Sequence, residues 1–506
     1  MSTATRVIKN TGFLYIKMAI TIVVSLFSTR LILNALGASD FGVYTIVGSS
    51  IGMLGFLNYT MANATQRYMS YAEGEGVYSN KLKVFNVSIL LHIVIAVLTT
   101  LILVIGYFVF FNGMLKIPDD RVFAAKVIYI CLVVSANFTI LNVPYEAIIN
   151  AHENMFYYSM VGIVESILKL GIAYLCVFTT SDKLIIYGIL ISIVPLITLI
   201  ALSVYCHRNY SECKIAIKDN FDIPLIKEIA FFSGWNFLTA ITNLVSNQGI
   251  GVVLNRFFGT TLNASHGIAQ QVNGQLSAFA ANMKKALNPV IVKSAGSKET
   301  ERMNYLAILG CKYSTLLTVL FAAPLILEMT YVLELWLKNV PEWAVLFCQL
   351  QLLITLIIQM SSSLGTSIYA QGDIKYYAIN KSIMNLLPIV FTYICFKLGG
   401  GPVWLYVPMV VFLGLGGNII ILFYSKKLCH LPVKEYLTML LWACVTIILV
   451  FAAGFVIKSV VTESFVRLVL TTLTTSITLC VFTYFFNLNT DERNYIKNVC
   501  FKKARV

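Results

Sequence analysis

Apolar segments long enough to cross a lipid bilayer follow one another along almost the whole chain, from Thr11 to Phe486. A bilayer core about 30 Å thick requires roughly 20 mostly apolar residues per helix. Transmembrane β-strands would instead show segments of about ten residues with alternating polarity. The pattern predicts about fourteen membrane helices, at residues 11–36, 42–63, 85–111, 123–146, 157–179, 184–206, 230–254, 265–291, 305–328, 343–366, 376–398, 402–424, 437–457 and 465–486. The expected fold class is an all-α polytopic membrane protein.

Composition and charge agree with this prediction and add an orientation. Hydrophobic residues make up 58% of the chain, charged residues 12%, and the net charge is +14. With the N-terminus placed in the cytoplasm, the inside loops and tails hold about 21 of the 37 basic residues and the outside loops about 7. Basic residues favour the cytoplasmic side, so both termini are predicted to be cytoplasmic. No basic stretch carries interleaved aromatic residues, which disfavours a nucleic-acid partner.

The two halves of the chain resemble each other. Leu33 and Gly37 recur as Leu254 and Gly259, Gly42 recurs as Gly267, and Ala151 with two following tyrosines recurs as Ala370, all in the same order and at nearly the same offset. A repeat of six helices predicts two pseudo-symmetric six-helix lobes around a central cavity, an architecture of transporters. The expected divisions are a lobe at 1–206, a cytoplasmic linker at 207–229, a second lobe at 230–424, two extra helices within 437–486 and a basic tail at 487–506.

Polar residues within the predicted helices mark a candidate cavity wall. In hydrocarbon, such residues face protein or a hydrated cavity. The candidates are Lys17 and Arg30 in the first helix, Asn243 and Asn247 in the seventh with Arg256 beyond, and His266, Gln270, Asn273, Lys284 and Lys285 in the eighth. Two alternatives stay open: the amides could hydrogen-bond helix to helix, and the lysines and arginines could extend to the lipid headgroups.

Glu165 and Lys169 form a separate candidate in the middle of the fifth helix. Their i, i+4 spacing allows the two charges to neutralise each other. The pair could simply orient the helix, or it could couple transport to an ion if protonation of Glu165 freed Lys169 for an anion. The eleven cysteines are scattered and the five histidines isolated, so we expect neither disulfides, nor a metal site, nor an organic cofactor.

The N-terminal part of the chain carries a family resemblance. It contains Thr29-Arg30, Leu36-Gly37, Asp40-Phe41-Gly42-Val43-Tyr44 and Gln66-Arg67-Tyr68. This resembles the opening of the O-antigen and capsule repeat-unit flippases (Wzx-type), in which an arginine and an "LG..DFG.Y" turn join the first two helices. The segments around Ala151 and Ala370 look like the two cytoplasmic turns of the same family. The family is part of the multidrug/oligosaccharidyl-lipid/polysaccharide exporter superfamily.

The resemblance implies a function. Its members move undecaprenyl-pyrophosphate-linked oligosaccharides across the bacterial cytoplasmic membrane by alternating access, for O-antigen, capsule or exopolysaccharide synthesis. In the related lipid II flippases, two extra C-terminal helices form a groove for the lipid tail. Related transporters exchange their substrate against H⁺ or Na⁺. The implied partners are the lipid-linked glycan, the bilayer and a polysaccharide polymerase machinery.

Two other classes of function remain as alternatives. A multidrug exporter of the same superfamily would usually have twelve helices, and its hydrophobic cations would favour acidic cavity residues, whereas the candidates here are mainly basic and amidic. A membrane polysaccharide polymerase would need a large outer loop with catalytic residues. The longest outer loop predicted, about 329–342, is short for that purpose.

Overall fold

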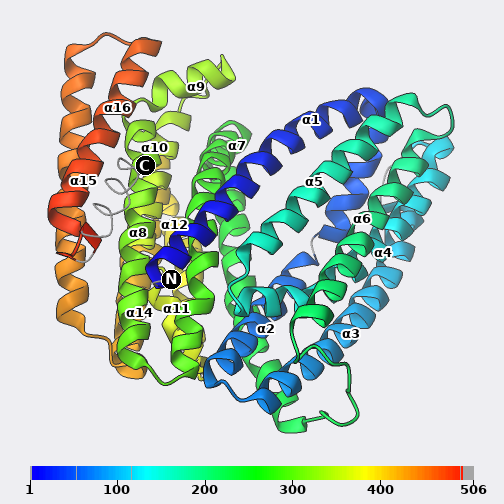
Figure 1. Ribbon diagram of the computed structural model, residues 1–506. Coiled ribbons are helices and arrows are strands. Elements are labelled where there is room, and N and C mark those ends of the chain that lie inside the picture. Colours follow the sequence, from blue (N-terminus) through cyan, green and yellow to red (C-terminus); the bar gives the residue numbers. More distant parts are fainter. Residues whose placement is uncertain (1–2, 53, 115–116, 491, 494–506) are drawn as a thin grey trace, which may run out of the picture. The chain divides into compact units, whose positions relative to one another are not determined.

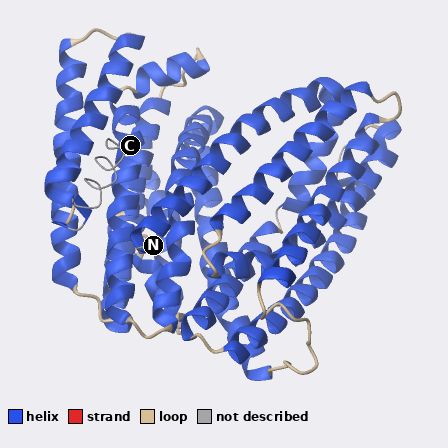
Figure 2. Ribbon diagram, viewed as in Figure 1, coloured by secondary structure: helices blue, strands red, loops and turns tan. Residues whose placement is uncertain are grey.

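The computed structural model describes residues 3–52, 54–114, 117–490 and 492–493, and the regular structure of these residues is entirely helical (Figures 1 and 2). Most of the predicted basic tail at 487–506 lies outside them. The α-helices are α1 (Thr3–Gly52), α2 (Gly55–Glu75), α3 (Tyr78–Val109), α4 (Val122–Ala151), α5 (Met155–Phe178), α6 (Lys183–Asn209), α7 (Ile223–Gly296), α8 (Thr300–Leu327), α9 (Met329–Leu337), α10 (Ala344–Gln359), α11 (Leu364–Gln371), α12 (Lys375–Lys397), α13 (Tyr406–Pro408), α14 (Gly417–Cys429), α15 (Val433–Val460) and α16 (Phe465–Phe482).

The number of membrane crossings agrees with the predicted fold class. Within the described residues, eleven helices are long and apolar enough to span a bilayer, and the pair α10 and α11, bent by 49°, makes a twelfth. Helix α7 has 74 residues, a path of about 110 Å at 1.5 Å per residue, and contains two of the predicted spans. The second span in α7 is therefore the thirteenth. The predicted span 42–63, which is divided here between the end of α1 and the start of α2, is the fourteenth. The protein is a multi-pass membrane protein.

The chain forms two compact units. Unit 1 comprises Met1–Ala240 and Lys285–Glu299, and unit 2 comprises Ile241–Lys284 and Thr300–Val506. In unit 1, α5 packs between α1 and α6, and α4 packs against α2, α3 and α6 (Figure 1). In unit 2, α15 and α16 pack against each other and against α8. Unit 1 therefore includes residues 207–240 and the last turns of α7, and unit 2 includes residues 437–486.

The internal repeat is visible in backbone conformation. Helix α1 breaks at Gly37, with φ 77° and ψ 167°, and α7 breaks at Gly259, with φ 77° and ψ −169°. Positive φ combined with an extended ψ is essentially restricted to glycine, because a Cβ would clash with the backbone. Both glycines are those that the sequence comparison aligns, so each repeat contains the same glycine kink between its first and second helices.

A second repeated feature is the turn after the fourth helix of each half. Helix α4 ends at Ala151 and α5 begins at Met155, while α11 ends at Gln371 and α12 begins at Lys375. A residue with positive φ occupies the same place in each turn, Glu153 (φ 58°) and Gly372 (φ 90°). These two residues are separated by the same offset as Ala151 and Ala370, so the turns align in structure as they do in sequence.

The segment 64–84, which lies between the predicted second and third spans, is mostly helical. Helix α2 continues to Glu75, and α3 begins at Tyr78. Tertiary contacts within unit 1 explain the extra helix. The guanidinium of Arg67 lies over the rings of Tyr68, Tyr71 and Phe232, at 4.3, 5.0 and 5.4 Å from their centroids. Such cation–π contacts bury a charge that hydropathy alone places in solvent.

A buried ion pair joins α16 to Glu328, the residue that directly follows α8. The Arg467 guanidinium lies 2.8 Å from the Glu328 carboxylate, and the two side chains are only 9% and 1% exposed. Thr471 donates a further hydrogen bond of 2.9 Å to the same carboxylate. Close packing accompanies the polar contacts, because a Cβ at Gly454 of α15 would collide with Leu327 of α8. These contacts make the two C-terminal helices an integral part of unit 2.

Candidate anion-binding site

Two lysines from distant parts of the chain converge on one tyrosine in unit 1. The ammonium groups of Lys17 on α1 and Lys285 on α7 lie 4.0 and 3.9 Å from the ring centroid of Tyr158 on α5. Lys285 Nζ also donates a hydrogen bond of 2.5 Å to the Tyr158 hydroxyl. All three side chains are half-buried. Tyr158 therefore contacts two positively charged groups, one from α1 and one from α7.

A carboxylate completes this cluster. Glu146, near the end of α4, interacts electrostatically with both Lys285 and Lys17, and it is half-buried like its neighbours. Within the described chain, however, no carboxylate oxygen lies within the 4.0 Å of an ion pair from either ammonium group. With all groups in their usual ionised forms, the two lysines and Glu146 carry one net positive charge. The cluster thus has unused capacity for an anion.

The local sequence explains why these side chains meet. Asn154 begins α5 by accepting a hydrogen bond of 3.2 Å from the Tyr157 amide, a favourable N-cap contact. Leu14, Met155 and Ala286, each at most 1% exposed, pack together beside Tyr158. Each lies one residue or one helical turn from Lys17, Tyr158 or Lys285. This apolar contact fixes how α1, α5 and α7 are aligned along their axes, and it thereby brings Lys17, Tyr158 and Lys285 to the same level.

A glycine makes room for Lys17. The side chain of Lys17 crosses α5 at Gly162, where a Cβ would collide with the methylene groups and the ammonium end of the lysine. A polar contact between the same helices lies one turn further on, where Thr21 and Ser166 share a hydrogen bond of 3.2 Å. Position 162 therefore controls where the Lys17 ammonium group can lie.

Glu165 and Lys169 form the predicted ion pair. The Lys169 ammonium lies 2.6 Å from the Glu165 carboxylate, and the side chains are 45% and 31% exposed, respectively. Glu165 also interacts electrostatically with Glu146 and Tyr158, so the pair borders the two-lysine cluster. A role in ion coupling stays a prediction.

The predicted residues of unit 2 do not form one site. His266 shares hydrogen bonds of 3.3 Å with Tyr406 and 3.4 Å with Gln270, and Asn273 accepts one of 2.5 Å from Thr355. The contacts with Tyr406 and Thr355 are helix-to-helix contacts of the packing alternative, whereas Gln270 lies one turn from His266 on α7 itself. The remaining predicted polar residues of both units, Arg30, Asn243, Asn247 and Arg256, are exposed.

Lys284 and Lys285, adjacent in sequence, have different surroundings. Lys285 contacts Tyr158 in unit 1, whereas Lys284 is in unit 2 and interacts with Cys311 of α8. Neighbouring residues on a helix point about 100° apart, which accounts for the divergence. Of the ten predicted cavity residues, the structure brings together Lys17 and Lys285. Sequence reasoning missed Glu146 and Tyr158 as their partners.

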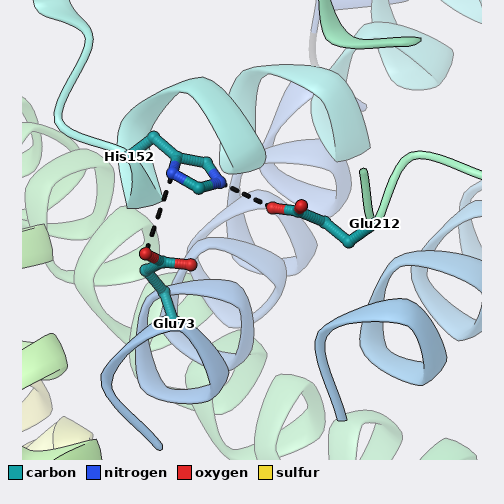
Figure 3. A group of neighbouring side chains, drawn as sticks. All are labelled: Glu73, His152 and Glu212. Atoms are coloured by element: carbon teal, nitrogen blue, oxygen red, sulfur yellow. Dashed lines mark hydrogen bonds and ion pairs between the residues drawn. The ribbon is translucent and has the colours of Figure 1, made fainter. Parts of the chain in front are cut away.

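A second polar cluster joins the ends of several helices in unit 1. His152, just after α4, lies with its Nε2 2.6 Å from Glu212 and its Nδ1 3.7 Å from Glu73 at the end of α2 (Figure 3). The group contains one histidine and two glutamates that are far apart in sequence, so no sequence motif marks it. Their candidate ligand atoms lie within 4.8 Å of one another, which is close enough for a metal ion.

The surroundings of this cluster favour an ion network over a metal site. The ammonium groups of Lys81 and Lys293 lie 2.6 and 3.3 Å from the Glu73 carboxylate. Two positive charges there already neutralise the carboxylate that a cation would need. The imidazole of His152 also stacks on the Tyr210 ring, with centroids 4.2 Å apart. We therefore interpret the cluster as an ion network that holds the segment 210–222, the connection between α6 and α7, against the ends of α2 and α4.

Acid should release this connecting segment. Burial of Glu212 acts to raise the pKa of its carboxyl, but hydrogen bonds from His152 and from the Glu212 amide outweigh burial and hold that pKa below its ordinary value. A lowered pKa in the folded state stabilises docking above the unfolded value of about 4.3, and the stabilisation is lost as the pH falls towards the folded value. We expect hydrogen exchange in 210–222, corrected for intrinsic rates, to rise below about pH 4.

The variant Glu212→Gln should show raised exchange at neutral pH and little further change on acidification. Asn86 offers a reference within the same contact, because its side chain binds Lys214 and Ala216 of the segment through neutral hydrogen bonds of 2.9 and 2.7 Å. An Asn86→Ala variant should loosen the segment without removing its pH dependence. Retention of the full pH dependence by Glu212→Gln would exclude the carboxylate as its source.

Comparison with known proteins identifies the fold. No family model and no curated protein sequence matches the chain. Among solved structures, a point mutant of a MATE protein superposes with a TM-score of 0.74 at 12% identity, over 84% of this chain and 96% of that one. A MOP superfamily transporter from Pyrococcus furiosus, described as having a binding pocket of reversed polarity, gives 0.70 at 13% identity over the same shares. An outward-facing multidrug resistance MATE family transporter gives 0.68 at 12%, again over these shares.

These similarities establish the fold of the MATE transporters of the MOP superfamily. They agree with the superfamily that the opening motifs indicated. At 12–13% sequence identity, the similarity shows only that the folds are alike. Which substrate this protein binds must be inferred from its own residues.

Proposed function

We propose that this protein is a flippase that moves undecaprenyl-pyrophosphate-linked oligosaccharides across the bacterial cytoplasmic membrane. The observation that carries the proposal is the convergence of Lys17 and Lys285 on Tyr158. The resemblance of the opening motifs to the Wzx-type flippases supports it independently. The distribution of basic residues supports an orientation with both termini in the cytoplasm.

The chemistry of the substrate fits such a site. A pyrophosphate and its sugars cannot enter hydrocarbon without partners, because each unsatisfied polar group there costs several kcal/mol. Two ammonium groups supply charge-assisted hydrogen bonds to phosphate oxygens, and the Tyr158 hydroxyl adds a third polar partner. Glu146 would offset one of the two positive charges when the substrate is absent. The isoprenoid tail would remain in the bilayer beside the protein.

A multidrug exporter is the second candidate, and one feature favours it. Unit 2 has a recess of about 380 Å³ beside α7, lined by two glutamines and by apolar side chains such as Phe279, Phe321 and Trp336. A pocket of this kind suits an apolar molecule. The two-lysine cluster argues against a hydrophobic cation as the substrate, because two positive charges outweigh the single nearby Glu146. The sign of the charge on the transported molecule therefore separates the two functions.

The glycine at position 162 provides a test of the site that leaves every charge in place. Gly162→Ala should displace Lys17 and reduce transport of a pyrophosphate-linked substrate by about tenfold, the equivalent of one charge-assisted hydrogen bond. Gly171→Ala is the matched control on the same helix, because a Cβ there meets no other atom within 4 Å. Both changes raise helix propensity equally. Equal transport rates in the two variants would show that the position of Lys17 is unimportant.

Reconstituted vesicles test the function itself. Purified protein in liposomes should move a fluorescent polyprenyl-pyrophosphate oligosaccharide between leaflets, measured by quenching with an impermeant reductant. The same vesicles should leave a lipophilic cation such as ethidium undisturbed, with or without a gradient of H⁺ or Na⁺. Movement of the cation without movement of the lipid would establish the exporter and reject the flippase.

A further inference from the structure

The segment 285–299 is part of unit 1 although it belongs to the second sequence repeat. By the internal repeat, the half of α7 after Gly259 corresponds to the helix after Gly37, and so it is a piece of the second repeat. Residues Ile241–Lys284 of α7 are in unit 2, but Lys285–Glu299 pack within unit 1. Unit 1 is thus completed by a segment that the second repeat supplies.

This segment docks on α2 by direct contact of two backbones. A Cβ at Gly74 of α2 would collide with the carbonyl of Lys293, and a Cβ at Gly296 would collide with the carbonyl of Tyr71. Gly74 of α2 thus packs against the backbone of α7, and Gly296 of α7 packs against the backbone of α2. A larger residue at either position must push the two helices apart. The ion pair of 3.3 Å between Lys293 and Glu73 lies beside this contact.

The same segment carries one half of the anion site. Lys285 and Ala286 are its first residues, and they make the contacts with Tyr158, Leu14 and Met155 described above. Lys17, Tyr158 and Glu146 are supplied by the first repeat alone. If 285–299 left unit 1, Lys285 would leave with it, and one ammonium group would remain beside Tyr158.

We propose that docking of 285–299 on α2 assembles the anion site, so that anion binding and docking stabilise each other. The inference rests on the proposed binding of pyrophosphate by Lys17 and Lys285. Coupling of this kind is reciprocal: an anion that binds the docked state more tightly favours docking, and weaker docking lowers the apparent affinity for the anion. A bound pyrophosphate would thereby stabilise the docking of 285–299 in unit 1.

The glycine contact allows the coupling to be measured without touching the site. We would determine the dissociation constant of inorganic pyrophosphate for the full-length protein in lipid nanodiscs by calorimetry. Gly74→Ala and Gly296→Ala should weaken binding by about tenfold, within the range typical of coupled sites. The matched controls are Gly55→Ala on α2 and Gly274→Ala on α7, because a Cβ at either position meets nothing within 4 Å. The controls should bind pyrophosphate as the unmodified protein does.

Hydrogen exchange supplies the second measurement on the same samples. Pyrophosphate should slow exchange in peptides covering 285–299 of the unmodified protein, and Gly74→Ala should raise their exchange in its absence. If an alanine variant fails to fold, Lys293→Gln weakens docking through the ion pair, with the exposed Lys298→Gln as its control. Raised exchange together with an unchanged dissociation constant would overturn the coupling and leave the anion site intact.

A different result would reject the proposed site itself. If the unmodified protein and a Lys17→Ala, Lys285→Ala double variant show the same absence of pyrophosphate binding, there is no anion site to assemble, and both proposals fail. If pyrophosphate binds with an affinity that requires both lysines but is indifferent to all four glycine substitutions, only the coupling fails.

Discussion

A double variant with Lys17→Ala and Lys285→Ala is expected to lose transport of a pyrophosphate-linked oligosaccharide altogether. In the proposed site each lysine would supply a charge-assisted hydrogen bond to phosphate, worth about 1.5–3 kcal/mol, so each single variant should be slowed by roughly tenfold to a hundredfold. The two ammonium groups share Tyr158 at 4.0 and 3.9 Å from its ring centroid, and so their effects should not be additive. The measurement is the rate of substrate movement in vesicles at matched protein levels.

The adjacent residue provides the control. Lys284→Ala removes the same charge one position earlier, but from unit 2, where the neighbour is Cys311. It should leave transport largely unchanged, and Lys285→Arg should retain part of it, because the charge persists while the geometry of its donors differs. Normal transport by the double alanine variant would remove the two-lysine cluster from the mechanism.

The second large effect concerns stability. Arg467→Ala should lower the free energy of unfolding by about 3–5 kcal/mol, because it leaves the Glu328 carboxylate buried without its partner. Glu328 is 1% exposed and accepts hydrogen bonds of 2.9 Å from both Arg467 and Thr471. The loss should be visible as a lower midpoint of thermal unfolding in detergent, followed by the fluorescence of the tryptophans.

Two further variants distinguish the buried pair from a general effect of charge. Glu463 is the other partner of Arg467, at 3.6 Å with a side chain 43% exposed, and Glu463→Ala should cost no more than about 1 kcal/mol. Replacing both members, as Glu328→Leu with Arg467→Met, should cost less than Arg467→Ala alone, since no charge is then buried. Equal losses from Arg467→Ala and Glu463→Ala would show that burial of the pair contributes nothing.

The helices and the repeat could be predicted from the sequence because each depends on a local signal. A run of about 20 apolar residues indicates a membrane helix wherever it occurs in the chain. Gly37 and Gly259 mark the kinks because only glycine readily adopts their backbone conformation. The extent of α2 could not be predicted in this way. Its second half carries polar residues that are buried by tertiary contacts, such as the stacking of Arg67 against Phe232 on a distant helix.

Only the two lysines of the candidate site could be predicted from the sequence, because the contacts between them depend on tertiary packing. Lys17 and Lys285 stood out as charges within apolar segments, but nothing local shows that they share Tyr158. The repeated tyrosine pairs at 157–158 and 376–377 indicate the repeat but not this contact, and the acidic Glu146 at the end of a span is the one further local signal. The cluster of Glu73, His152 and Glu212 had no such signal, because its members meet only through the packing of unit 1 (Figure 3).

The leaflet position of lipid-linked oligosaccharides in cells that lack this protein tests the central claim most directly. Their pool can be extracted and quantified, and its orientation can be probed with a membrane-impermeant glycosidase or lectin. The flippase function predicts that complete repeat units accumulate on the cytoplasmic side, protected from the probe, while surface glycan is lost. Units that reach the outer leaflet at the normal rate, with surface glycan intact, would contradict it.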